Sequence, residues 1–457
     1  MKTKRLACAA VLACILIPAS FADAQLFQTL CSFNYANGDG PRAGLTLGPD
    51  GNLYGATEYG GGGSDIGTVF QVTTNGTVNT LFSFSGSGEG SPEAAMTLGP
   101  DGDFYGTCPG GGDFYGSVFK LSTNGTITTV CSFNGADGDG PQLATLTLGP
   151  DGNFYGTTQE GGSDDDNGYG LGTVFKVTPG GRLTTLVSFN GTNGEIPWAG
   201  LTLGPDGNLY GTAAGGGNYD NGTIFQVTTN GTLTTLVSFN GTNGGDPGAA
   251  LTLGLDGNLY GTTYAGGDYG AGTVFKVTTN GTLSTLASFD EADGMGPQAP
   301  VMFGPDGNLY GTTSAGSPGN SWYGTVFKLT PTGTLDTLVF FDRTNGATPM
   351  AGLTLGSDGN LYGTTVYGGS SGEGTVFRLV LPPVVHPTLT LQLSTGCPQL
   401  NLAGTLGNNY VVQYATNLAN PNWVNLLSLT NLQASPFSFL DPAGVVPPAR
   451  YYRAVMQ

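Results

Sequence analysis

The stretch that decides the fold is Gly200–Phe239, GLTLGPDGNLYGTAAGGGNYDNGTIFQVTTNGTLTTLVSF. It predicts four short β-strands, because apolar and β-branched residues alternate in GLTLG, NLYGTA, GTIFQVT and TLTTLVSF. Pro205-Asp206-Gly207 predicts a turn between the first two strands, and Asn230-Gly231 predicts a two-residue hairpin turn between the last two. A Gly-rich loop joins the second strand to the third. We name these strands a, b, c and d.

The same four-strand pattern recurs along most of the chain at intervals of about 50 residues. Each copy has G-[TS]-[VI]-F at the start of strand c, and a Pro in the loop between strand d and the next strand a. The tyrosine of the motif GPDGNLYGT marks the copies at Tyr54, Tyr105, Tyr155, Tyr210, Tyr260, Tyr310 and Tyr362. Four-stranded units at this period are typical of an all-β protein built as a β-propeller.

The two ends of the repeat array predict how such a propeller closes. The array begins with a d-type strand, Leu26–Phe33, and ends at a c-type strand, Gly374–Val380. The N-terminal strand can therefore complete the last unit, an arrangement that an open solenoid with capping repeats would not need. We predict a seven-bladed β-propeller of four-stranded blades over residues 25–380, closed by its N-terminal strand.

The repeat also resembles a known family. The pattern F-x-x-x-[ND]-G-x-x-P, followed by L-x-L-G-x-D-G-N-L-Y-G-T-T and G-T-V-F-K-[VL], is similar to the GloVer tandem repeat of exported bacterial proteins. The resemblance covers Leu26 to about Val380, with local departures such as Leu255 and Ser357 in place of the turn Pro. It implies a propeller-like, exported protein, and it carries over no catalytic residue. Kelch repeats share the period, but they place Tyr and Trp differently.

Both termini have a different composition from the repeats. Residues 1–24 predict a signal peptide, because Lys2, Lys4 and Arg5 precede a short apolar stretch and Ala22-Asp23-Ala24 offers small residues for cleavage. Lipidation at Cys14 is the alternative. We therefore expect a secreted or cell-surface protein, extracellular or periplasmic, and no later segment is apolar enough for a transmembrane anchor.

Beyond the repeats, residues 381–387 form a Pro-containing linker, and residues 388–457 alternate apolar and polar side chains in six short runs. This pattern predicts a small β-sandwich. The segments YVVQYATNLANPNW and RYYRA resemble the fibronectin-III-like modules that end many exported bacterial proteins.

Charge and residue types exclude several classes of function. With 13 Lys and Arg against 32 Asp and Glu, the formal charge is −19, so we expect no nucleic-acid partner. The single His, His386, lies in the linker, which removes a Ser-His-Asp triad and any His-rich metal centre. The Lys residues of strand c and the Asp residues of the a–b turn recur from copy to copy, so we interpret them as scaffold.

Function is expected where the copies differ, and that is mainly in the b–c loops. In an up-and-down blade these loops lie at the same end as the d–a loops, so together they form one variable face. Each b–c loop carries an aromatic residue, which gives the candidate ligand-binding residues Tyr59, Tyr115, Tyr169, Tyr219, Tyr269, Trp322, Tyr323 and Tyr367. Aromatic rings beside carboxylates and Gly backbone suit stacking on sugars, although each ring could instead pack over its own loop.

Three functional hypotheses follow. The favoured one is a non-catalytic, exported binding or adhesion scaffold whose partner is a polysaccharide or cell-surface protein, with no organic cofactor and an undetermined oligomeric state. The second is a carbohydrate-active enzyme that uses two carboxylates, from Glu58, Glu160, Asp165, Glu195 and Asp246. The third is a structural envelope protein. Asp164, Asp165 and Asp166 could in addition hold Ca²⁺, although their spacing is not that of an EF-hand.

Overall fold

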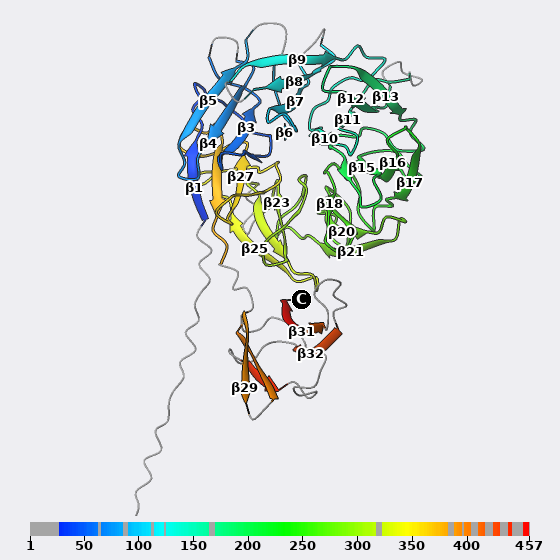
Figure 1. Cartoon of the computed structure of the whole chain (residues 1–457). Helices are drawn as coiled ribbons and strands as arrows, with labels where there is room; N and C mark the ends of the chain where they lie inside the picture. Colours follow the sequence, from blue (N-terminus) through cyan, green and yellow to red (C-terminus); the bar gives the residue numbers. More distant parts are fainter. Residues whose placement is uncertain are drawn as a thin grey trace, which may run out of the picture. The chain divides into compact units, whose positions relative to one another are not determined.

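The structure is a computed structural model of the chain, which forms two compact units, Met1–Pro382 and Pro383–Gln457 (Figure 1). The predicted signal peptide and most of the predicted linker lie outside the described residues. The described residues are 27–62, 65–85, 90–110, 114–122, 125–163, 170–316, 322–382, 388–394, 397–403, 410–415, 424–429, 437–440 and 451–456.

The first unit consists of repeated four-stranded antiparallel sheets, as the sequence predicts. The stretch 200–239 forms β14 (Thr202–Leu203), β15 (Leu209–Ala213), β16 (Thr223–Val227) and β17 (Leu233–Ser238), hydrogen-bonded in that order. Strand a is shorter than the sequence predicts. The carbonyl of Leu201, just before β14, accepts a hydrogen bond from Thr147 Oγ1 of the preceding repeat. Neighbouring repeats are therefore joined along their innermost strands.

Seven such sheets lie within the described residues, and they follow one another around a common centre (Figure 1). The a strands are β2 (Thr46–Leu47), β6 (Thr97–Leu98), β10 (Thr147–Leu148), β14, β18 (Thr252–Leu253), β22 (Met302–Phe303) and β26 (Thr354–Leu355). The b strands are β3 (Leu53–Thr57), β7 (Phe104–Cys108), β11 (Phe154–Thr158), β15, β19 (Leu259–Thr263), β23 (Leu309–Thr313) and β27 (Leu361–Thr365). The c strands are β4 (Thr68–Val72), β8 (Ser117–Leu121), β12 (Thr173–Val177), β16, β20 (Thr273–Val277), β24 (Thr325–Leu329) and β28 (Thr375–Leu379). The d strands are β5 (Val78–Ser83), β9 (Ile127–Ser132), β13 (Leu183–Ser188), β17, β21 (Leu283–Ser288), β25 (Leu335–Phe340) and β1 (Phe27–Ser32).

The N-terminal strand occupies the d position of the last sheet, whose order is β1-β28-β27-β26. Phe27 pairs with Leu379 and Ser32 with Thr375, with the same kind of register shift that the other c–d pairs have. Thr354 Oγ1 donates to the carbonyl of Leu45, so the last a strand is also bonded to the first repeat. This all-β arrangement is that of a propeller-like fold.

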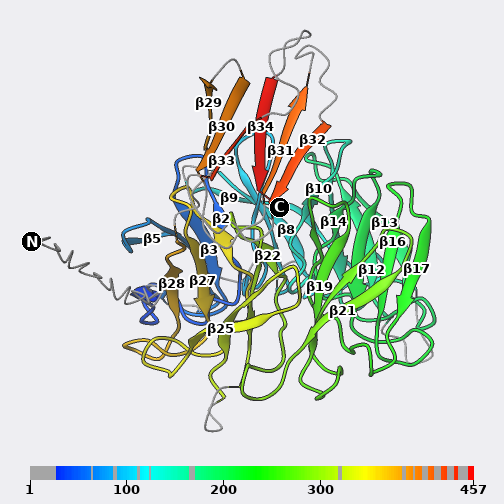
Figure 2. The ribbon, with the colours of Figure 1, turned by 90° about the horizontal axis from the view of Figure 1, so that it is seen from below.

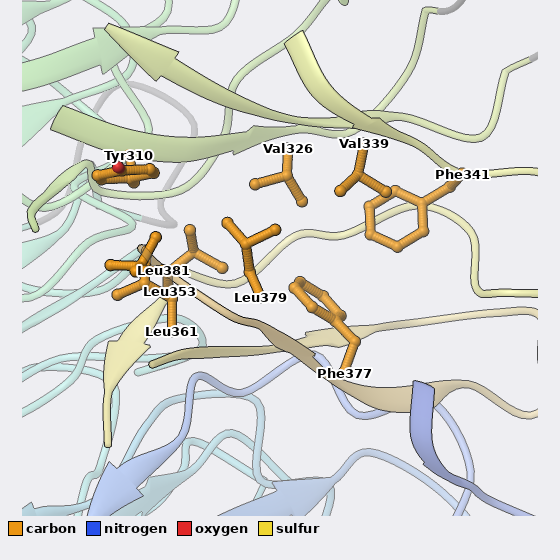
Figure 3. Close-up of a cluster of buried hydrophobic side chains, with 9 residues drawn as sticks. All are labelled: Tyr310, Val326, Val339, Phe341, Leu353, Leu361, Phe377, Leu379 and Leu381. Carbon is orange, nitrogen blue, oxygen red and sulfur yellow. The ribbon is translucent and has the colours of Figure 1, made fainter. Parts of the chain in front are cut away.

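The hydrophobic core lies between successive sheets. In one cluster, Val326 and Val339 of the β22–β25 sheet meet Leu361, Phe377 and Leu379 of the next sheet, and all of these side chains are buried (Figure 3). Equivalent clusters recur between the other sheets. Because each sheet covers its neighbour, a single repeat could not bury its own apolar faces.

The recurring polar residues belong to the scaffold. In the β14–β17 sheet, the turn residue Asp206 accepts hydrogen bonds from Tyr210 Oη at 2.8 Å and from Gln226 Nε2 at 3.0 Å. Where strand c carries Lys instead, Lys276 Nζ lies 2.8 Å from Asp256 Oδ2. Partial burial disfavours the charge of Asp206, but its hydrogen bonds outweigh that cost and lower its pKa.

The second unit contains β29 (Thr388–Ser394), β30 (Cys397–Ala403), β31 (Tyr410–Ala415), β32 (Val424–Leu429), β33 (Phe437–Leu440) and β34 (Tyr451–Met456). They form two three-stranded antiparallel sheets, β29-β30-β33 and β32-β31-β34 (Figure 2). The six strands lie where the alternation predicts them. A fibronectin-III-like sandwich stays a prediction. No helix in the described part of the chain has the length and apolarity to cross a bilayer.

Candidate functional site: the loop face and its central cavity

The d–a loops and b–c loops are hydrogen-bonded to one another at one end of the sheets. The residue before each recurring Pro makes the main-chain hydrogen bonds that connect these loops, as Asp246 illustrates. Its N–H donates to the carbonyl of Asn221 in the preceding repeat, and its carbonyl accepts from Tyr264 N–H, both at 3.0 Å. Asp246 has a φ of 56°, and every equivalent residue also has a positive φ. This ladder fixes the positions of the residues that follow it.

A cavity of about 360 Å³ is lined by residues of the a strands and of the d–a loops that precede them. The residue after the recurring Pro varies among the copies, and five of these residues line the cavity: Arg42, Glu93, Gly248, Gln298 and Met350. The sequence analysis did not select this position. The sequence does mark this position, because the variable residue stands between a Pro found in every copy and an Ala found in nearly every copy.

A second cavity of about 290 Å³ adjoins the first, because Leu143, Gly248 and Gln298 line both. Its remaining lining consists of Trp198, Asp246 and Tyr264. We call this second cavity the side recess. Of its residues, only Asp246 was among the candidates chosen from the sequence.

An ion cluster stands at the edge of the central cavity. Arg42 Nε lies 2.8 Å from Glu58 Oε2, and Arg42 Nη1 lies 3.4 Å from Glu93 Oε2. Both glutamates are nearly buried. Burial, and then the charge of Glu58, raise the pKa of Glu93 to about 6 despite the opposing effect of Arg42. The cluster therefore holds one carboxyl that takes up a proton in mildly acidic solution.

Replacing Glu93 with Gln is expected to stabilise the protein at pH 8 by up to roughly 2 kcal/mol. The folded carboxyl keeps its proton to about pH 6, against an ordinary value of 4.5. Unfolding therefore releases a proton between these pH values, and stability falls as the pH rises through that window. Urea denaturation at pH 4 and pH 8 measures the effect, which should vanish at pH 4. Glu291→Gln, at an exposed loop residue, is the control and should show no such difference.

The candidate aromatic residues are mostly exposed. Tyr59, Tyr115, Tyr219, Tyr269, Trp322 and Tyr367 have exposed fractions from 40% to 70%. Tyr323 is half-buried and packs against the core cluster between the last two sheets, and Tyr169 lies outside the described residues. Exposed aromatics that the sequence analysis did not select are Tyr35, Phe114, Tyr264 and Phe340.

Some of these rings also rest on their own loops. A Cβ built on Gly135 would lie 3.1 Å from Tyr115 Cε1, so the ring lies against the backbone of the adjoining d–a loop. Tyr59 is hydrogen-bonded to Glu58, and this bond is the main cause that raises its pKa to about 12. The rings are therefore held in place while much of their surface faces solvent.

The five carboxylates proposed for hydrolysis do not form one group. Glu58 contacts Arg42, and Asp246 lines the side recess. Glu160 and Glu195 line neither cavity, and Asp165 lies outside the described residues together with Asp164 and Asp166. Among the residues that the structure describes, no three His, Cys, Asp or Glu side chains are arranged to hold a metal ion.

The loop face nevertheless concentrates acidic groups. Asp39 lies on this face beside Glu373, and burial together with the charge of Glu373 raises the pKa of Asp39 to about 6. At neutral pH these carboxylates make the face negative, in keeping with the net charge of the chain. This negative charge would attract cations and repel anions.

Comparison with known proteins supplies the family. The sequence model of the Gloeobacter/Verrucomicrobia repeat matches residues 20–203 and 165–377, which together cover most of the chain. The chain belongs to the Gloeobacter/Verrucomicrobia repeat family. The matched residues include the recurring Pro positions and the loops of the face in this Gloeobacter/Verrucomicrobia repeat protein. No curated protein is similar enough to count as a match.

Solved structures resemble the Gloeobacter/Verrucomicrobia repeat protein only distantly. A gluconolactonase from Xanthomonas campestris shares 14% identity at a TM-score of 0.39, over 78% of this chain and 89% of its own. A luciferin-regenerating enzyme shares 13% identity at a TM-score of 0.39, and the match covers 78% of this chain and 95% of that enzyme. A protein of unknown function from Dyadobacter fermentans shares 11% identity at a TM-score of 0.44, and the match covers 78% of this chain and 99% of that protein. At TM-scores below 0.5, these likenesses support no statement about activity.

Proposed function

We propose that this protein is an exported binding scaffold, a closed seven-bladed propeller whose loop face binds a polysaccharide or another cell-surface component. Three observations support closure: the seven sheets, the pairing of β1 with β28, and the hydrogen bond from Thr354 to Leu45. A signal peptide at residues 1–24 and a sandwich module at residues 388–457 belong to the same proposal.

The observation that carries the binding proposal is the set of exposed aromatic rings at one loop position. Tyr219 and Tyr269 are 61% and 70% exposed, and they occupy equivalent b–c loops of neighbouring repeats. Large exposed aromatic side chains are costly to leave in water and suit stacking on the apolar face of a sugar.

The double substitution Tyr219→Ala and Tyr269→Ala is expected to weaken polysaccharide binding at least tenfold, because each stacking contact is worth about 1 kcal/mol. Binding is measured on a panel of polysaccharides and surface fractions, with Ca²⁺ or chelator present to detect a metal-dependent component. Leu255→Ala is the control, since Leu255 is fully exposed but lies in the a–b turn at the opposite end of the sheets. Absence of binding to every glycan would refute the proposal.

The carbohydrate-active enzyme is the second candidate, and one observation favours it. Glu93, with its pKa raised to about 6, is a carboxyl of the kind that acts as a general acid, and Glu58 lies on the other side of Arg42. The arginine contacts both carboxylates, and this favours a structural ion cluster. Release of reducing sugar by the wild type and its loss in Glu93→Gln would instead support the enzyme.

A further inference from the structure

The side recess has two aromatic walls set on glycine. A Cβ on Gly248 would lie 3.3 Å from Trp198 Cε3, so the indole lies directly against that backbone. A Cβ on Gly296 would lie 2.6 Å from Tyr264 Cε2, so the phenol ring is seated in the same way. Tyr264 keeps 43% of its surface exposed. The recess therefore has fixed aromatic surfaces and, at about 290 Å³, enough room for one sugar ring.

Two polar groups of the recess lack a partner among the described residues. Trp198 Nε1 is buried and makes no hydrogen bond. An unpaired buried N–H costs roughly 1–3 kcal/mol, so an acceptor atom on a ligand would be stabilising there. The carboxylate of Asp246 likewise makes no side-chain hydrogen bond within the described chain, and burial raises its pKa. A bound cation would favour the charged form of this carboxylate.

The backbone explains why Asp246 can serve as a fixed anchor. Its φ of 56° and its two main-chain hydrogen bonds, to Asn221 and from Tyr264, hold the residue in one conformation. Equivalent positions carry Gly40, Gly140 and Gly296 in three repeats, and a carboxylate stands there only in this one. The recess therefore occurs at one place in the array of repeats, because its carboxylate is found in one copy, whereas the exposed loop tyrosines recur.

We propose that the side recess binds one protonated amino-sugar residue, with its ammonium group on Asp246. The sugar ring stacks on Tyr264, and one of its oxygens accepts the hydrogen bond from Trp198 Nε1, which points along the plane of the indole. The aromatic surfaces also favour a cation, and the negative charge of the loop face raises its local concentration. A neutral sugar would leave Asp246 without a counterion, and a simple amine would leave Trp198 Nε1 without an acceptor.

This proposal rests on glycan binding by the loop face and names the class of sugar at one position. The test titrates the full-length mature protein with a trimer of β-1,4-linked glucosamine at pH 6 and follows heat release. The N-acetylated trimer, a glucose trimer and ethylamine are the comparison ligands. We expect the glucosamine trimer to bind at least tenfold more tightly than each of the other three. Equal binding of any one of these three ligands would overturn the proposal.

Two variants locate the site. Asp246→Asn keeps the shape and tolerates a positive φ, and Trp198→Phe removes Nε1 but retains an aromatic ring. Each is expected to weaken binding of the glucosamine trimer at least tenfold, and Asp246→Asn should also abolish its preference over the N-acetylated trimer. Leu255→Ala, in the a–b turn at the opposite end of the sheets, should bind the trimer as the wild type does. If glycans bind but neither recess variant changes affinity, the recess proposal fails while the proposed function stands; if no glycan binds, both fail.

Discussion

Removing residues 25–33 from a chain that begins at residue 25 is expected to destabilise the first unit by more than roughly 5 kcal/mol, enough to unfold an ordinary domain. Phe27 packs its ring against Phe341 and Phe377, with centroids 5.7 and 5.4 Å apart, and Phe33 is completely buried. The truncation also exposes the hydrogen-bonding edge of β28, which promotes association between chains. Thermal denaturation and the soluble yield measure the loss.

Moving the deleted strand to the end of the last repeat tests whether stability is lost because the last sheet lacks its d strand or because the chain is shortened. In the truncated chain, residues 27–33 are inserted after Leu379 through Thr-Thr-Asn-Gly-Thr, the connection that joins β16 to β17. Because β1 pairs antiparallel with β28 as β17 does with β16, this chain should regain most of the lost stability. Wild-type stability in the truncated protein, or no recovery after the transplant, would contradict closure by the N-terminal strand.

The substitution Gly272→Ala is expected to cost about 3 kcal/mol or more, a large effect for one methyl group. Gly272 has a φ of +103°, which L-residues rarely adopt. A Cβ there would also lie 2.4 Å from the carbonyl oxygen of Thr263 and 2.7 Å from Pro297 Cδ of the next repeat. The backbone of two repeats would have to move apart. Urea denaturation measures the loss in free energy of unfolding, and the m-value should stay the same as in the wild type.

A matched glycine isolates the steric part of this effect. Gly257, in the a–b turn of the same repeat, has a φ of +76°, but a Cβ there would meet nothing within 4 Å. Gly257→Ala should therefore cost only about 1 kcal/mol, from backbone strain alone. Similar losses in the two variants would show that crowding between repeats does not matter at Gly272.

Much of the fold could be predicted from local sequence. The turn residues Pro205-Asp206-Gly207 and Asn230-Gly231 act on their own neighbours, so strand positions followed from the repeat unit alone. The offset between Leu26–Phe33 and Gly374–Val380 predicted the partner of β1, and the structure has this pairing. The shortness of strand a was not predicted, because the carbonyl of Leu201 is bonded by another repeat.

The candidate site was predicted less completely. The aromatic residues of the b–c loops could be chosen because they recur at one position, and most of the described ones are exposed. Glu93 and Trp198 stand alone in their repeats and match no motif. Their neighbours Arg42, Tyr264 and Gly248 come from other repeats, so only their positions in space reveal the contacts.

The sequence by itself determined the repeat family, the strands and the turns, because these depend on interactions within about 50 residues. Only the tertiary structure decided which variable residues share a cavity. The residues after the recurring Pro converge because each sheet turns its a strand toward the centre, where residues from several repeats meet. The raised pKa of Glu93 and the unpaired Trp198 Nε1 follow from that convergence, since burial and charge depend on neighbours in space.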